Sequence, residues 1–111
     1  MNQDWMPLAF QPVYKDYIWG GARLATQLGR AEAPARAAES WEVADHADGQ
    51  SVVADGPLAG QTLRDLCRAH GAALLGTVAT EAVFPLLIKL IDARECLSVQ
   101  VHPDDAAAAR F

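Results

Sequence analysis

The sequence predicts a fold made mainly of β-strands with short helices between them, and three observations support this class. Residues 96–102 alternate polar and apolar side chains, which is the period of a half-buried strand. The preceding run, Leu86–Ile91, is apolar apart from Lys89 and suits a second strand. The segments with helical spacing are short, and they end at glycines such as Gly29 and Gly71.

Composition and charge describe one acidic domain. The chain has 111 residues, 51% of them hydrophobic, and a formal net charge of −5 at pH 7. This length and apolar content suit a single domain with a core. The sequence has no basic run to attract nucleic acid or an anionic membrane, no apolar run long enough to span a bilayer, and no signal-peptide pattern in MNQDWMPLAF. We therefore expect a soluble, cytoplasmic protein.

The two cysteines lie in different predicted elements. Cys67 falls in a predicted helix and Cys96 in a predicted strand, without the spacing of a CxxC motif. Because disulfides are rare in a reducing compartment, we expect two partly buried free thiols.

The start of the chain predicts an extended arm, a turn and a short helix. Residues 6–14 contain two prolines, which suits an edge strand or an extended arm. Aromatic residues then precede Gly20 and Gly21, which mark a turn. Trp19 is therefore either a substrate-stacking side chain or an aromatic residue packed beside the turn. Residues 22–28 have helical spacing and are followed by a glycine.

The middle of the chain predicts short strands and one capped helix. Glu39–Asp45 reads as a strand with Trp41 on one face and Glu42 on the other. Glu39 and Glu42 fall on different faces, so they do not form a paired acid and base. A turn and the short strand Ser51–Ala54 follow. Thr62 then suits the N-cap of a helix that ends at a glycine.

The most informative stretch predicts a β-hairpin. A turn at Asp92–Glu95 would join the apolar strand to the alternating strand, Cys96–His102. This register places Lys89 opposite Ser98, and Leu87 opposite Gln100. One face would then carry an ammonium, a hydroxyl, an amide and an imidazole, from Lys89, Ser98, Gln100 and His102. This face is a candidate site, and a one-residue bulge would break the arrangement.

Two residues of this face could bind a metal. Histidine is a common zinc ligand and an amide oxygen is a rarer one, so Gln100 and His102 offer two donors on one strand. Two donors do not complete a zinc site, and a hydrogen-bonded strand histidine remains the alternative. Asp104 and Asp105 follow Pro103 and suit the start of a helix, with a metal-binding acidic pair as the alternative.

Several stretches, taken together and in order, resemble one family, the type I mannose-6-phosphate isomerases (phosphomannose isomerases). The matching stretches are Ile18-Trp19-Gly20-Gly21 with Leu24, Glu39-Ser40-Trp41-Glu42 with His46, Gly60-Gln61-Thr62-Leu63, Phe84 to Ala93 (FPLLIKLIDA), and Leu97 to Asp105 (LSVQVHPDD). The last two stretches are the most specific, and the resemblance spans nearly the whole chain.

The resemblance implies a cupin-like (jelly-roll) β-sandwich enzyme. It would interconvert mannose 6-phosphate and fructose 6-phosphate with one Zn²⁺, through an enediol(ate) proton transfer. It implies that Gln100 and His102 are zinc ligands. It also implies that the pocket for the phosphorylated hexose is lined by Lys89 and Ser98, with Trp19 and Glu39 nearby.

The resemblance also implies that more residues are needed for a complete site. The family's other zinc ligands, a Glu in a GKTE-like stretch and a His, and its later Arg all lie downstream of the matched stretches. The helical, uncapped residues 106–111 fit this, so we expect residues 1–111 to be the N-terminal segment of the catalytic (cupin) domain. A non-catalytic cupin-like module that binds a sugar or a partner is the alternative. We also expect self-association through an exposed sheet edge.

Overall fold

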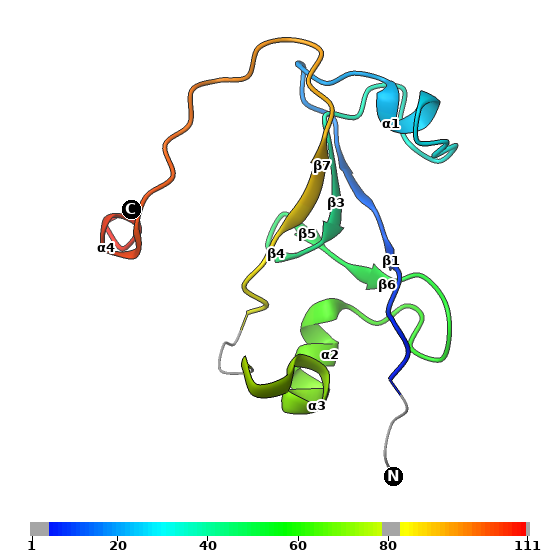
Figure 1. The fold of residues 1–111 in the computed structure, drawn as a ribbon, viewed down its shortest axis with the longest axis vertical. Helices are drawn as coiled ribbons and strands as arrows, with labels where there is room; N and C mark the ends of the chain where they lie inside the picture. The colour runs from blue at the N-terminus through cyan, green and yellow to red at the C-terminus, as the bar shows by residue number, and fades with distance from the viewer. Residues whose placement is uncertain (1–4, 79–82, 111) are drawn as a thin grey trace.

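A three-stranded antiparallel sheet forms the centre of the computed structural model, which describes residues 5–78 and 83–110 (Figure 1). Its strands are β2 (Val13–Lys15), β3 (Glu39–Val43) and β7 (Ile88–Ile91), with β3 in the middle. Since β2 is an edge strand, the expectation for the proline-containing arm is confirmed.

Two smaller strand pairs flank this sheet. They are the antiparallel pairs β1 (Phe10–Gln11) with β6 (Val52–Val53), and β4 (Asp45–His46) with β5 (Gly49–Gln50). Pro12, which has no backbone N–H to donate, separates β1 from β2. The chain therefore passes from one sheet to the other at this proline.

The helices are short, as the sequence predicts. They are α1 (Arg23–Thr26), α2 (Leu63–His70), α3 (Ala72–Leu75), the 3₁₀ turn η1 (Gly76–Val78) and α4 (Asp105–Ala108). The Thr62 hydroxyl accepts a 3.1 Å hydrogen bond from the backbone N–H of Asp65, which confirms the predicted N-cap of α2. Among the described residues, no helix is both long and apolar enough to cross a membrane.

The core is small and lies around β3 and the buried side of α2. Its buried apolar residues are Leu24, Ala37, Ala38, Trp41, Ala44, Val53, Leu63 and Leu66. Several polar side chains are equally buried, namely Glu39, Ser40, Asp45, Ser51 and Asp92. Each of these carboxylates and hydroxyls therefore needs a hydrogen-bonding partner inside the protein.

The β7 strand has one paired edge and one open edge. It pairs with β3, placing Trp41 opposite Lys89, and the register shifts between Trp41 and Val43. Within the described part of the chain, no strand pairs with the other edge of β7. Its apolar side chains are exposed, Ile88 by 50% and Ile91 by 52%, which is the pattern expected of an edge strand that can associate.

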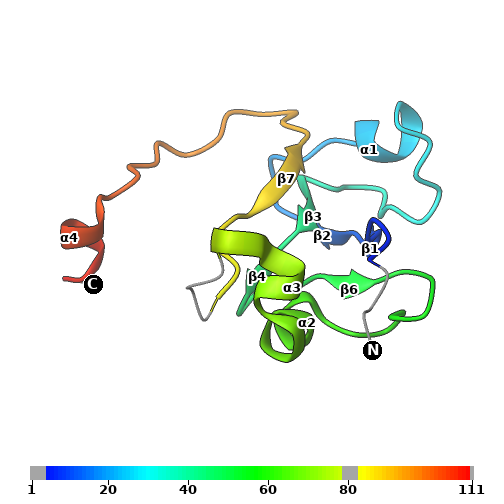
Figure 2. The ribbon, with the colours of Figure 1, turned by 60° about the horizontal axis from the view of Figure 1, so that its bottom comes forward.

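The predicted hairpin is wrong in this structure. Residues 96–104 have no regular secondary structure and all are exposed, with Val99 at 97%. Figures 1 and 2 both show this segment running away from the sheet toward α4. Lys89 therefore has no strand pairing with Ser98, and Leu87 has none with Gln100.

The turn residues explain this outcome, because they are bound by earlier parts of the chain. The backbone N–H of Asp92 donates to the carbonyl of Ala38, and Ala93 bridges to Gly20. Residues 92–95 thus continue the direction of β7 instead of reversing it. The radius of gyration is 16.3 Å, against about 13 Å for a compact chain of this length, as expected when a segment extends from the body.

Candidate functional site

One face of the three-stranded sheet gathers charged and aromatic side chains, and we call it the polar face. It consists of Lys15 from β2, Glu39 and Trp41 from β3, and Lys89 from β7. The register pairs Lys15 with Glu39 and Trp41 with Lys89. Since directly opposed residues of antiparallel strands point to the same side, all four side chains share one face.

The Glu39 carboxylate is the centre of the polar face. One oxygen, Oε1, lies 3.1 Å from the Lys89 ammonium, and the other, Oε2, accepts a 2.8 Å hydrogen bond from Trp41 Nε1. The Glu39 side chain is 8% exposed and that of Lys89 is 34% exposed. A lysine ammonium has three donors, and the described residues use one of those on Lys89. The structure thus brings together two of the predicted site residues and leaves Lys89 able to bind an anion.

The opposite face of β3 carries a separate ion pair, as the alternation predicts. The Arg30 guanidinium donates to both oxygens of Glu42 at 2.7 and 3.1 Å, and the Ser40 hydroxyl donates to Glu42 at 2.7 Å. Burial alone would raise the pKa of Glu42, but the hydrogen bonds from Arg30 and Ser40 hold it below its ordinary value. Glu42 therefore stabilises the loop that precedes β3 and takes no part in the polar face.

Trp19 lies beside the turn in a position shaped by the backbone. Its carbonyl accepts hydrogen bonds from the N–H groups of Arg94 and Glu95, at 2.8 and 3.2 Å. Its half-buried ring is tilted against that of Tyr17, with the ring centroids 5.7 Å apart. The turn before α1 is therefore joined to the end of β7, which holds the Trp19 ring near the surface.

Asp92 fixes this junction. Its carboxylate accepts 2.7 Å hydrogen bonds from the backbone N–H and the Nε of Arg23, although its side chain is 4% exposed. Burial would raise the pKa of Asp92, but the bonds from Arg23 and its positive charge hold that pKa below the ordinary value. A Cβ atom at Gly21 would lie 2.6 Å from the carboxylate, so the glycine is required for this close approach. Nothing in the sequence pattern indicates this pairing.

The predicted metal ligands, Gln100 and His102, are not on the polar face, and neither is Ser98, the residue predicted to line the substrate pocket. Ser98, Gln100 and His102 are all on the exposed segment after β7, and the structure does not bring them to the polar face. His102 Nδ1 lies 3.2 Å from the carbonyl of Pro103. Within residues 5–78 and 83–110, no cluster of three His, Cys, Asp or Glu side chains could hold a metal ion. Two donors without a third do not fit a zinc site in this arrangement.

The acidic pair after Pro103 has the structural role that the sequence suggests. The Asp104 carboxylate accepts a 2.8 Å hydrogen bond from the backbone N–H of Ala107, which makes it the N-cap of α4. Asp105 occupies the first turn of the helix, where a negative charge is favourable.

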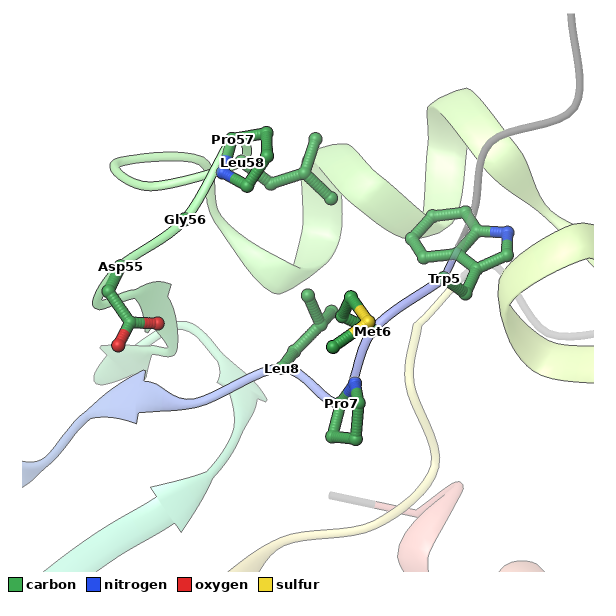
Figure 3. A pocket seen from close by; sticks show the side chains of 8 residues that line it. All are labelled: Trp5, Met6, Pro7, Leu8, Asp55, Gly56, Pro57 and Leu58. Carbon is green, nitrogen blue, oxygen red and sulfur yellow. The ribbon is translucent and has the colours of Figure 1, made fainter.

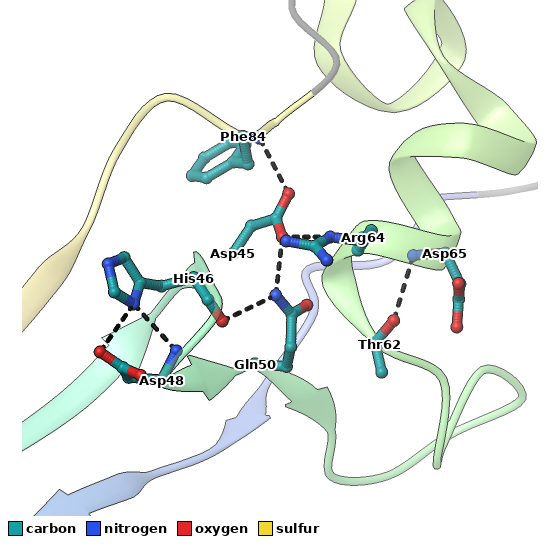
Figure 4. A network of polar contacts seen from close by, with 8 residues as sticks. All are labelled: Asp45, His46, Asp48, Gln50, Thr62, Arg64, Asp65 and Phe84. Atoms are coloured by element: carbon teal, nitrogen blue, oxygen red, sulfur yellow. Dashed lines mark hydrogen bonds and ion pairs between the residues drawn. The ribbon is translucent and has the colours of Figure 1, made fainter.

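A third buried carboxylate joins the β4–β5 hairpin to the rest of the chain (Figure 4). The Asp45 side chain is fully buried and accepts from Gln50 Nε2, Arg64 Nε and the backbone N–H of Phe84, at 2.7, 2.8 and 3.0 Å. Burial would raise the pKa of Asp45, and these three donors together lower it instead. Its partners belong to the hairpin, to α2 and to the approach to β7, so Asp45 has a structural role.

One hollow of about 410 Å³ lies between the N-terminal arm and the loop at 55–58, and no residue of the polar face lines it (Figure 3). Its lining is mostly apolar and consists of residues 5–8 and 55–58. It offers one carboxylate, from Asp55, and no cationic group. It is therefore unsuited to an anionic ligand such as a phosphorylated sugar.

The thiols are unpaired, as expected. Cys67 is half-buried, and burial raises the pKa of its thiol, while Cys96 is exposed instead of partly buried. Cys96 is exposed because residues 96–104 form no strand and extend away from the sheet.

Comparisons with known proteins agree with the fold. Residues 8–111 match the family model for the catalytic domain of type I phosphomannose isomerase. The chain is 46% identical over 99 residues to the probable mannose-6-phosphate isomerase GmuF of Bacillus subtilis, covering 89% of this chain and 31% of that protein. It is 46% identical over 102 residues to mannose-6-phosphate isomerase ManA of the same organism, covering 92% of this chain and 31% of ManA.

A solved structure gives the same result. The crystal structure of the mannose 6-phosphate isomerase from Bacillus subtilis superimposes with a TM-score of 0.84 at 38% identity, covering 94% of this chain and 32% of that one. The prediction of a mainly β, cupin-type fold with short helices is thereby confirmed. The chain belongs to the type I phosphomannose isomerase family. It spans about a third of the length of the curated relatives that it matches.

Proposed function

We propose that this chain supplies part of the substrate site of a mannose-6-phosphate isomerase that acts in the cytoplasm. The observation that carries the proposal is the Lys89 ammonium. It is held on the polar face by Glu39, is one-third exposed, and keeps two donors for an anion. A phosphorylated hexose is an anion with many hydroxyls, and a fixed ammonium beside a carboxylate suits both kinds of group.

The roles of the individual residues follow from their chemistry. Lys89 binds the phosphate or stabilises negative charge that develops on a sugar oxygen during isomerisation. Ser98 donates to the same oxygens, and Trp19 packs against the sugar ring. Ser98 can do so only when residues 96–102 lie beside the sheet, an arrangement that this structure does not contain. Glu39 holds Lys89.

The proposed reaction moves a carbonyl group between C1 and C2 of the sugar. A base removes the proton from the carbon next to the carbonyl, and an enediol(ate) forms. A proton then goes to the former carbonyl carbon, while the hydroxyl proton of the neighbouring carbon passes to the former carbonyl oxygen. The negative charge of the enediolate is stabilised by a nearby cation, for which Lys89 is the candidate on this chain. We assign no residue of residues 1–111 as the base.

Zinc dependence is part of the proposal. A zinc site needs more ligands than Gln100 and His102 can supply. We propose that Gln100 and His102 supply two ligands and that at least two others come from outside residues 1–111. Among the described residues, no group of three His, Cys, Asp or Glu side chains could hold a metal ion. We therefore derive no step of the reaction through the metal.

A binding module without catalysis is the second candidate. The separation of Lys89 from Ser98, Gln100 and His102 favours it, because a sheet face could bind a sugar phosphate without assembling the remaining groups. An assay for isomerase activity distinguishes the two candidates, since a binding module produces no fructose 6-phosphate.

Calorimetric titration of the chain tests the shared claim of both candidates. Mannose 6-phosphate should bind more tightly than mannose, and Lys89→Met should remove most of the difference. Arg68→Met, which removes an exposed positive charge on α2, is the matched control and should leave the difference intact. Equal binding of the two sugars, or equal effects of the two substitutions, would contradict the role of Lys89.

A further inference from the structure

We propose that Trp41 is a positioning residue that sets the orientation of Glu39 and, through Glu39, the place of the Lys89 ammonium. This inference deepens the proposed function and rests on it. Trp41 is 5% exposed, so its indole is not a surface on which a sugar ring can stack. Its single polar atom, Nε1, donates to Glu39 Oε2 at 2.8 Å, which leaves Oε1 for Lys89.

The Trp41 ring is held from several sides, so its N–H can point in one direction. The Lys15 ammonium lies 4.3 Å from the ring centroid, a cation–π contact, and also donates to the carbonyl of Asp48. The His46 ring stands at 90° to the indole with the centroids 5.4 Å apart. A Cβ atom at Gly49 would lie 2.8 Å from the indole, so the backbone packs directly on the ring.

These contacts connect three parts of the fold that are separate in sequence. Asp48 and Gly49 belong to the β4–β5 hairpin, Lys15 to β2 and Lys89 to β7. The hairpin packs on Trp41, Trp41 orients Glu39, and Glu39 holds Lys89. Without the indole N–H, Glu39 Oε2 would lose its hydrogen bond, and Lys89 would be left as the partner that orients the carboxylate. The ammonium would then lose its fixed place.

The charges of the polar face support the same assignment. Two ammonium groups, from Lys15 and Lys89, lie on the face with one carboxylate, from Glu39. Lys15 is engaged with Trp41 and Asp48, and Glu39 is engaged by two donors. Lys89 keeps two donors for a ligand, and Glu39, oriented by Trp41, determines where those donors lie, whereas the Lys15 ammonium lies over the Trp41 ring.

Nuclear magnetic resonance tests the positioning without any sugar. Trp41→Phe removes the indole N–H and keeps a ring in the core. In the unsubstituted chain the Lys89 ammonium should give an observable ¹⁵N–H signal, because its hydrogen bond slows exchange with water. Trp41→Phe should abolish that signal. Trp5→Phe, which changes a tryptophan beside His70, should preserve it. A Lys89 signal that survives Trp41→Phe would overturn the proposal.

A double-mutant cycle on mannose 6-phosphate binding separates positioning from a general loss of structure. Trp41→Phe should weaken binding by about tenfold to a hundredfold, which is the effect of losing one hydrogen bond to a charged group. In the Lys89→Met background the same substitution should change binding by less than about twofold. Independent, additive effects would overturn the proposal.

The two experiments also distinguish the inference from the proposed function. If Lys89→Met leaves sugar-phosphate binding unchanged, the proposed function of Lys89 fails, and the resonance experiment still decides whether Trp41 positions its ammonium. If Trp41→Phe does not fold, Glu39→Gln takes its place in both experiments. Its carboxamide keeps the size of Glu39 and should give the same loss of the Lys89 signal. Retention of that signal in Glu39→Gln would overturn the proposal.

Discussion

Removing the Asp92 carboxylate should destabilise the chain more than any single surface charge does. Asp92→Ala breaks two 2.7 Å hydrogen bonds, one to the backbone N–H of Arg23 and one to its Nε. Ala22, at the N-cap of α1, makes no side-chain capping bond, so Asp92 supplies the cap from a distant part of the chain. The substitution therefore removes a helix cap, an ion pair and the link between the turn and β7.

The size of the effect follows from the burial of the two partners. A hydrogen bond to a charged group contributes about 1.5–3 kcal/mol, and a helix cap about 1 kcal/mol. The Arg23 side chain is 59% exposed and can be hydrated after the loss, so the ion pair contributes at the low end. We expect about 2–3 kcal/mol, or a decrease in Tm of roughly 8–12 °C for a domain of this length.

Thermal unfolding followed by circular dichroism measures this, with Asp16→Asn as the matched control. Asp16 pairs with Arg36, and the two side chains are 64% and 49% exposed. Breaking that surface pair should cost less than about 0.5 kcal/mol. A decrease in Tm no larger than that caused by Asp16→Asn would contradict the predicted role of Asp92.

Three further predictions concern the buried carboxylates, the open edge of β7 and the proposed zinc ligands. Because the folded-state pKa values of Asp92, Asp45 and Glu42 lie below their ordinary ones, these carboxylates stabilise the fold above about pH 4. This stabilisation is lost as the pH falls through the lowered pKa values, so the denaturant midpoint of unfolding should decrease on acidification. Asp92→Asn should reduce that decrease, and a midpoint that does not change with pH would contradict the prediction. Sedimentation should show self-association through the open edge of β7, and Leu90→Lys should weaken it by placing a charge there; a monomer at all concentrations would contradict it. Zinc should bind the chain alone more weakly than about 1 μM, because the two proposed ligands, Gln100 and His102, are fewer than the usual four; tight one-to-one binding in a competition titration would show a complete site.

The sequence predicts those elements whose signals are local. Thr62 with its capping geometry, the glycine that ends α2, and the alternation in β3 depend on neighbouring residues, and the structure contains all three. The opposite faces of Glu39 and Glu42 follow from the same alternation. The family resemblance, carried by motifs in order along the chain, is confirmed by the family match over residues 8–111.

The hairpin could not be predicted correctly from alternation, because alternation does not name a partner. The pattern in residues 96–102 requires a surface on which Val99 and Val101 can be buried, and in this structure both are almost fully exposed. The β7 strand pairs with β3 instead, and the Asp92 carboxylate accepts a hydrogen bond from the backbone N–H of Arg23, 69 residues earlier in the chain. Such long-range contacts have no signature in the local spacing of residue types.

The residues that complete the polar face were missed for the same reason. Lys15 lies at the end of an edge strand, in a stretch without a motif, and Trp41 reads as an ordinary core aromatic residue. Their contact with each other, and that of Trp41 with Glu39, depends on the register of three strands. The pairing of Glu39 with Lys89 has one local signal, since Lys89 is the single charge in an otherwise apolar strand and needs a partner of opposite charge.

The activity of a chimera would show whether residues 8–111 can supply their part of an isomerase site. The segment of ManA that matches this chain would be replaced by residues 8–111, and the conversion of mannose 6-phosphate to fructose 6-phosphate would be measured in the presence of zinc. We predict an active isomerase that loses most of its activity with Lys89→Met or His102→Ala and keeps it with Arg68→Met. A folded chimera that is inactive, or one whose rate is unchanged by Lys89→Met and His102→Ala, would contradict the proposed isomerase function and the roles of these two residues.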